Sequence, residues 1–232
     1  MVFSSRSGQS VTTLAFLVTR WAFSAHRATV LTACGNDTED DQNVETVPIN
    51  KSAAIYFSRV GNTDFPDDID AVASVSLNRV NGELKGNAQL MAEWIADEAG
   101  CKAYEIVSEE SYPVDYNATV DLAKQEQADS KRPELKSDFT DLKECDTIWL
   151  AFPNWWTDLP VPVYTFFEKY DLAGKNIYVF ETHEGSGFSS TVNTIRELEP
   201  DAKVVKALSV RGGSVTGEES SIREYVKKQL QK

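Results

Sequence analysis

Two loops about ninety residues apart carry the side-chain types that a phosphorylated ring compound needs. The first follows the apolar run 53–57 and consists of Ser58, Arg59, Val60, Gly61, Asn62 and Thr63. The second follows the apolar run 147–152 and consists of Pro153, Asn154, Trp155 and Trp156. Hydroxyl, amide and glycine N–H groups at a strand end can hold a phosphate, and indole faces stack on flat rings. The pair therefore indicates a site for flavin mononucleotide (FMN).

A third loop follows the apolar run 176–181 and contains a histidine among glycines. Its candidate ligand-binding residues are His183, Gly185, Ser186, Gly187 and Phe188. Glycine lets a backbone approach a ring edge closely and offer its N–H groups. His183 by itself is as compatible with a structural role as with a chemical one. The case for a site is the conjunction of three loops, because parallel strands end at the same edge of a sheet.

The elements that must position these loops alternate along the chain. Short β-branched or aromatic runs, typical of strands, occur at 53–57, 103–107, 147–152, 176–181 and 203–210. Segments of helical length and spacing lie between or after them, at 88–99, 118–129, 160–169, 189–198 and 218–230. Strands that alternate with helices predict βαβ units and a parallel α/β sheet. Residues 51–232 are therefore expected to form one domain.

One segment interrupts this alternation, between the first loop and its helix. Residues 64–86 begin with an acidic stretch and contain the pair Asn81-Gly82 between short strand-like runs. Asn-Gly is the strongest short signal for a two-residue β-hairpin. We expect an insertion with a small hairpin, which is either functional or a tolerated surface addition.

The three loops together resemble those of the flavodoxin family. The resemblance lies in Ser-Arg-Val-Gly-Asn-Thr at 58–63, Pro-Asn-Trp-Trp at 153–156 and Thr-His-Glu-Gly-Ser-Gly-Phe at 182–188, and it covers about 52–232. It implies a doubly wound sheet of five parallel strands in the order 2-1-3-4-5. It also implies that the first loop holds the FMN phosphate, that the second flanks the ring and that the third lies at the ring's far edge.

Four features depart from that family's pattern. Val60 replaces a threonine, which removes one hydroxyl from the phosphate loop. The 64–86 insertion delays the helix, so its N-terminal dipole must come from near Gly86-Asn87. Glu184 and Thr157 each stand where a glycine is common. Glu184 is expected to disfavour a negatively charged reduced cofactor, and without glycine at 157 a backbone flip on reduction is not implied.

The resemblance implies an electron carrier that needs no catalytic acid or base. Its partner would be a redox protein or a small electron acceptor. The alternative is an NAD(P)H-dependent flavin or quinone reductase on the same fold. The sequence shows no second nucleotide-binding signature, which favours the carrier.

Charge and composition exclude some other functions. The formal net charge is −13, so the chain offers no basic stripe for nucleic acid. With three cysteines and two histidines, and no ligand-type spacing among them, a zinc site is not expected.

The first fifty residues are read separately from the domain. Leu31-Thr32-Ala33-Cys34-Gly35 resembles the lipobox of bacterial lipoproteins, and the acidic stretch that follows it resembles a tether. Lipidation of Cys34 would anchor the chain at the outer face of the cell membrane, its only membrane contact. Arg20, His26 and Arg27 interrupt the apolar stretch that a signal peptide needs. The alternatives are a misassigned start or altered reading frame upstream of Leu31, or a chance match to the lipobox; the alternative location is the cytoplasm.

Overall fold

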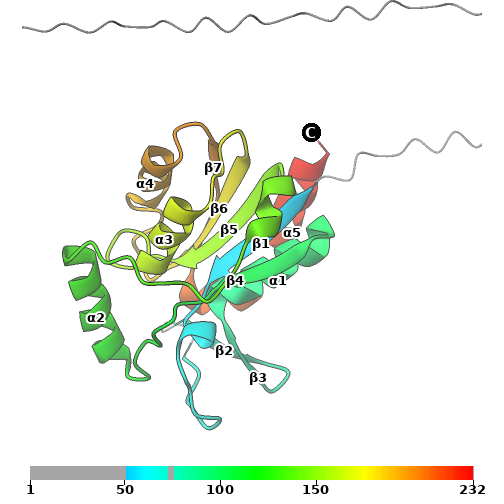
Figure 1. The fold of residues 1–232 in the computed structure, drawn as a ribbon. Helices are drawn as coiled ribbons and strands as arrows, with labels where there is room; N and C mark the ends of the chain where they lie inside the picture. Colours follow the sequence, from blue (N-terminus) through cyan, green and yellow to red (C-terminus); the bar gives the residue numbers. More distant parts are fainter. Residues whose placement is uncertain (1–50, 73–75, 232) are drawn as a thin grey trace, which may run out of the picture. The chain divides into compact units, whose positions relative to one another are not determined.

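The computed structural model describes residues 51–72 and 76–231. Its main sheet has five parallel strands, drawn in Figure 1: β1 (Ser52–Phe57), β4 (Lys102–Ile106), β5 (Thr147–Pro153), β6 (Asn176–His183) and β7 (Lys203–Arg211). Their spatial order is β4-β1-β5-β6-β7. When the five strands of the main sheet are numbered by themselves along the chain, without β2 and β3 of the separate hairpin, this order is 2-1-3-4-5. The predicted strand order and fold class are therefore confirmed.

Helices cover both faces of this sheet. α1 (Asn87–Ala99) and α5 (Glu219–Leu230) pack on one face, and α3 (Val161–Lys169) and α4 (Thr191–Leu198) pack on the other. A parallel sheet buried on both faces needs strands that are apolar throughout, and all seven residues of β5 are buried. α2 (Tyr116–Ala128) stands to one side of these layers in Figure 1, beside the loop that follows β5.

The predicted hairpin lies between β1 and α1. β2 (Leu77–Val80) and β3 (Glu83–Gly86) pair antiparallel across Asn81 and Gly82, whose φ angles are 53° and 87°. Two positive φ angles are what a type I′ turn requires. The hairpin is therefore confirmed within the insertion.

The hairpin returns the chain to the end of β1. A Cβ on Gly86 would collide with the hydroxyl of Ser58, so only glycine allows the two backbones to approach this closely. Gly86 caps α1, whose first residue is Asn87. The N-terminus of α1 therefore still lies against the first loop, although twenty-three residues separate them in the sequence.

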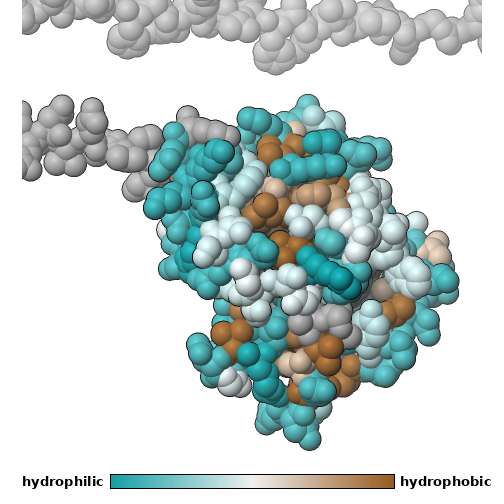
Figure 2. All heavy atoms as spheres, turned by 180° about the vertical axis from the view of Figure 1, so that it is seen from behind, coloured by the Kyte–Doolittle hydropathy of each residue, from teal (hydrophilic) through white to brown (hydrophobic). Residues whose placement is uncertain are grey.

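The surface of the described part is mostly hydrophilic. Figure 2 shows the molecule from behind, where hydrophilic side chains surround scattered hydrophobic ones. Within residues 51–72 and 76–231, no helix has the length and apolar character needed to cross a bilayer. Cys34 and the predicted tether lie outside the described residues.

Candidate functional site

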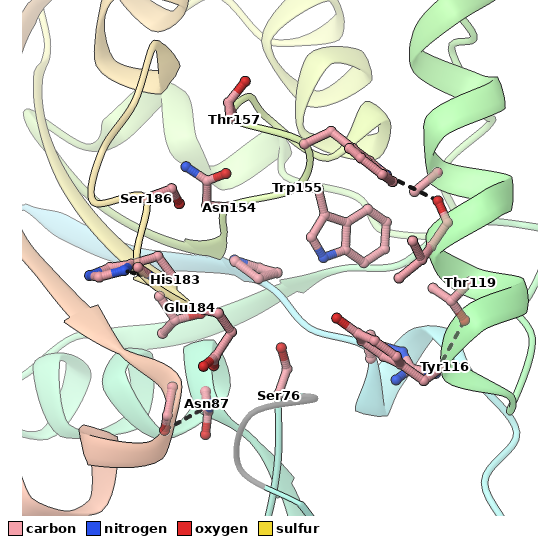
Figure 3. A pocket seen from close by; sticks show the side chains of 18 residues that line it. Ser76, Asn87, Tyr116, Thr119, Asn154, Trp155, Thr157, His183, Glu184 and Ser186 are labelled. Atoms are coloured by element: carbon pink, nitrogen blue, oxygen red, sulfur yellow. Dashed lines mark hydrogen bonds between the residues drawn. The ribbon is translucent and has the colours of Figure 1, made fainter.

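A cavity of about 410 Å³ lies where β1, β5 and β6 end, which is within the size range of small-molecule sites. Figure 3 shows Trp155 between two walls: Tyr116 and Thr119 from α2 on one side, and His183 and Ser186 on the other. The sequence-predicted residues that line this cavity are Arg59, Pro153, Asn154, Trp155, Trp156, His183, Gly185 and Ser186. Three distant loops therefore converge on one cavity.

The remaining predicted residues lie elsewhere. Val60 and Thr63 line a second cavity of about 400 Å³, beside the inserted hairpin. Five predicted residues line neither of these two cavities: Ser58, Gly61, Asn62, Gly187 and Phe188. Contact between the first loop and a phosphate thus stays a prediction, and only Arg59 of that loop faces the cavity that holds the tryptophans.

The side chain of Asn62 joins the ends of two strands. Its Nδ2 donates to the carbonyl oxygens of Ser58 and Ile106, both at 2.9 Å, and its Oδ1 accepts from the Ser108 N–H at 2.8 Å. These bonds tie the loop after β1 to the end of β4. Because the buried amide is fully engaged in them, its role is to shape the loop.

Arg59 carries a buried charge at the cavity wall. Only 2% of the residue is exposed, and Nη2 donates to the carbonyl oxygens of Pro113 and Val114 at 3.1 and 3.2 Å. Its guanidinium also lies 5.2 Å from the ring centroid of Phe65 and 6.0 Å from that of Tyr116. Burial lowers the pKa of Arg59.

Two further observations concern the same guanidinium. No carboxylate among the described residues forms an ion pair with it, and its buried Nε has no hydrogen-bond partner there. Asp115 and Tyr116 act on the guanidinium electrostatically but compensate its charge only in part, since burial still lowers the pKa of Arg59. A buried guanidinium whose charge is only partly compensated attracts an anion, because low dielectric leaves its field poorly screened. The cavity therefore has a place for a negatively charged group.

A partly buried carboxyl, that of Glu105, lies against the first loop. A Cβ on Gly61 would collide with the carboxylate of Glu105, which accepts hydrogen bonds from the Gly61 N–H and from the Tyr56 hydroxyl. Burial raises the pKa of Glu105 to about 7. Glycine at 61 is thus needed for close approach to a strand β4 side chain.

The two tryptophans of the second loop have different environments. Trp155 packs edge-on against Phe57 and Tyr112, with ring centroids 5.2 Å away in both cases. Trp156 is 46% exposed, and its Nε1 donates to the Val120 carbonyl oxygen at 3.0 Å. Both line the cavity. The core holds Trp155 rigidly, whereas α2 holds Trp156 at the rim.

The backbone at this point forms a strained turn. Trp155 and Asp158 exchange both N–H···O bonds, at 3.0 Å each, around Trp156 and Thr157. Those two central residues have φ angles of 53° and 65°. Left-handed conformations cost non-glycine residues roughly 1–2 kcal/mol each. The turn that glycine would form easily is thus formed here by a tryptophan and a threonine.

The second and third loops are connected by the side chain of Asn154. Its Nδ2 lies 2.9 Å from Glu181 Oε1, 3.1 Å from the Gly187 carbonyl oxygen and 3.3 Å from Ser189 Oγ. Within the third loop, the Gly185 N–H donates to His183 Nδ1 at 2.8 Å. His183 therefore accepts a backbone hydrogen bond as a structural histidine does.

Several cavity residues are not among the predicted binding residues, although the sequence places Asn87, Thr157 and Glu184 near the predicted cofactor. α2 supplies Tyr116, Thr119, Val120 and Ala123, and the rest are Ser76, Asn87, Thr157, Thr182, Glu184 and Gly212. α2 could not be assigned to the cavity because nothing in its sequence shows that it leaves the face of the sheet. At the rim of the cavity, Glu184 Oε2 lies 3.8 Å from Arg211 Nε.

Comparison with known proteins identifies the same family that the loops resemble. A family model described as flavodoxin matches residues 80–229, which begin after the first loop. No protein of curated function matches the chain.

Three solved structures share the fold. A protein assigned as a flavoprotein from Bacteroides uniformis is 26% identical, with a TM-score of 0.53, and the match covers 79% of this chain and 99% of that one. One from Bacteroides eggerthii is 22% identical, with a TM-score of 0.55 and coverages of 77% and 96%. A flavoprotein in complex with FMN from Lactobacillus acidophilus is 22% identical, with a TM-score of 0.51 and coverages of 74% and 99%.

Glu105 generates a prediction about stability and pH. Since burial raises its folded-state pKa to about 7, the folded chain keeps a proton that the unfolded chain releases at its ordinary, lower pKa. The free energy of unfolding should therefore fall as pH rises toward about 7, and then level off. In Glu105→Gln the free energy of unfolding should fall less steeply with pH than in the wild type. Urea unfolding curves recorded over a pH series measure both slopes.

Glu181 and Glu199 contribute in the same direction, since burial raises the pKa of each to about 7. Some slope will thus remain in Glu105→Gln. Glu109→Gln, at an exposed neighbouring site, is the matched control and should keep the full slope. Parallel curves for wild type and Glu105→Gln would show that Glu105 does not titrate in this way.

Proposed function

The chain belongs to the flavodoxin family, and from that premise we propose that it binds FMN and carries electrons. One observation above all supports the proposal. A single cavity combines the buried guanidinium of Arg59, which forms no ion pair with a described carboxylate, with the aromatic side chains Trp155 and Trp156. A phosphate and a flat conjugated ring are the two chemical groups that such a wall accommodates.

The residues present fit each part of this ligand. Arg59, with the nearby N-terminus of α1 at Asn87, would hold the phosphate. Trp155 and Trp156 would contact the ring. The third loop, at Gly185 and Ser186, would reach its polar edge. Bound FMN would supply the redox chemistry, while these residues bind it, orient it and shape its electrostatic surroundings.

The sequence supports a carrier over a reductase, because it shows no second nucleotide-binding signature. The cavity of about 410 Å³ is within the range of about 300–1,000 Å³ for ligand pockets. We therefore propose exchange of electrons with a redox partner protein or a small acceptor. The net charge of −13 favours a partner with a basic surface.

The phosphate contact can be tested with two flavins that differ only in the phosphate. The wild-type chain should become yellow with FMN and bind it more tightly than riboflavin. Arg59→Met should reduce the FMN-to-riboflavin affinity ratio about tenfold or more, because a charge-assisted hydrogen bond is lost. Arg59→Lys keeps the charge and should retain part of the ratio. Fluorescence titration measures both affinities.

The ratio separates phosphate recognition from any general damage to the fold, since damage weakens both flavins. Lys124→Met is the matched control. Lys124 belongs to α2, its Nζ lies 5.1 Å from the ring centroid of Trp156, and it does not line the cavity. A wild-type chain that ignores FMN would refute the proposed function. Equal binding of the two flavins would refute the role of Arg59 alone.

Carrier and reductase differ in their response to nicotinamide nucleotides. For a carrier, NADH or NADPH should bleach the bound FMN no faster than free FMN under anaerobic conditions. Stopped-flow absorbance measures the rate. Rapid bleaching with either nucleotide would favour the NAD(P)H-dependent flavin or quinone reductase instead.

We propose lipid anchoring at Cys34, which rests on the lipobox-like sequence alone. The full chain, expressed in a bacterium, should incorporate labelled palmitate and partition with the membrane fraction. Cys34→Ala should lose both properties. An unlabelled wild-type chain in the soluble fraction would favour the cytoplasmic alternative.

A further inference from the structure

Glu181 is a fully buried carboxyl directly behind two of the cavity loops. It lies near the end of β6, and its side chain faces α4. One oxygen, Oε1, accepts from Asn154 Nδ2 at 2.9 Å. The other, Oε2, is hydrogen-bonded to the hydroxyl of Thr191, the first residue of α4. The single carboxyl thus contacts the loop after β5 and the segment after β6.

The bond to Asn154 determines which atom that side chain offers to the cavity. Three acceptors surround Nδ2: Glu181 Oε1, the Gly187 carbonyl oxygen and Ser189 Oγ. The amide nitrogen must therefore face away from the ligand, since it has two protons for these acceptors. Oδ1 accepts no hydrogen bond from the residues that the structure describes, and Asn154 lines the cavity. It is thus left as an acceptor for a ligand N–H.

Thr191 gives Glu181 two distinct hydrogen-bonding arrangements. The Thr191 hydroxyl also lies 2.6 Å from the Phe188 carbonyl oxygen, but a hydroxyl has only one proton. When Glu181 is ionised, Thr191 donates to it. When Glu181 carries a proton, that proton is donated to Thr191 Oγ1, and Thr191 donates to Phe188. The base of the third loop therefore responds to the protonation of Glu181.

Two charged side chains face Glu181 from the packed elements. Asp158, which follows the second loop, is already engaged with the Tyr164 hydroxyl at 2.7 Å and the Thr194 hydroxyl at 3.0 Å. Lys206 of β7 extends to 5.7 Å from the Phe188 ring centroid and makes no ion pair with Glu181. Burial raises the pKa of Glu181 to about 7, so both protonation states occur near neutral pH.

We propose that Glu181 is a positioning residue for the ring subsite, and that it takes up a proton from solvent when the bound flavin gains an electron from its redox partner. The proposal rests on the proposed function. In the ionised state the carboxylate fixes Asn154 and places a negative charge behind the ring. Reduction of a bound flavin to an anionic form would add a second negative charge nearby, and protonation of Glu181 would remove the repulsion between them.

The first test measures the midpoint potential of the FMN-loaded chain across neutral pH. Glu181→Gln keeps the shape and resembles the protonated acid, so its potential should match wild type well below pH 7. Well above pH 7 it should lie higher, because the variant lacks the buried charge. The wild-type inflection linked to Glu181 should disappear. Identical pH profiles for the two proteins would overturn the proton uptake.

Glu184→Gln is the matched control for this measurement. Glu184 lies at the rim of the same cavity but contacts neither Asn154 nor Thr191 in the described structure. Its removal should leave the inflection in place. Glu181→Asp is a second variant that keeps the charge on a shorter side chain, and it should retain the inflection with weaker FMN binding.

The second test needs no flavin. In the apo chain, the side-chain NH₂ resonances of Asn154 should shift with the same midpoint as the Glu181 carboxyl carbon in an NMR titration. In Glu181→Gln the Asn154 resonances should no longer shift. An Asn154 side chain insensitive to Glu181 in the wild type would overturn the positioning role. A chain that binds no FMN would refute the proposed function and the proton uptake, and this titration would still decide the positioning role.

Discussion

Polar groups shielded from water at the strand ends need hydrogen-bond partners, and here the buried Asn62 and the partly buried Asn154 find them in neighbouring loops. Asn62 joins the end of β1 to β4, and Asn154 joins the loop after β5 to the loop after β6. Leaving such a group unpaired costs about 1–3 kcal/mol, so each amide fixes the relative position of two chain segments. The parallel sheet brings the loops to one edge, and these amides set their spacing there.

The same requirement limits what the first loop can offer to a ligand. The Asn62 amide is used in shaping the loop, and Val60 and Thr63 face the second cavity. What remains at the main cavity is the charge of Arg59. Carbonyl oxygens and two aromatic rings surround its guanidinium, and these neutral groups offset only part of the desolvation of a full charge. An anionic ligand would complete the balance.

The sequence was sufficient where a local rule governs the structure. Apolar runs predicted the five strands, and Asn81-Gly82 predicted the hairpin, because a type I′ turn selects those residue types. It was insufficient where partners are distant in the chain. The turn at Trp156 and Thr157 has no glycine to announce it, and it is held by contacts such as the bond from Ser190 Oγ to the Thr157 carbonyl oxygen. Glu181 resembles any polar residue in a strand until its partners are known.

Two glutamates, the partly buried Glu105 and the fully buried Glu181, lie behind the cavity loops, on opposite faces of the sheet. Glu105 bonds Tyr56 on the α1 and α5 side, and Glu181 bonds Thr191 at the start of α4. Burial raises the pKa of each to about 7. Since the loops in front of them are fixed by buried hydrogen bonds, moving the backbone would break several of those bonds at once. Gain or loss of a proton changes the charge behind the cavity without any such movement. When the charge in the cavity changes, protonation of these glutamates therefore costs less free energy than a backbone movement that breaks the hydrogen bonds of the loops.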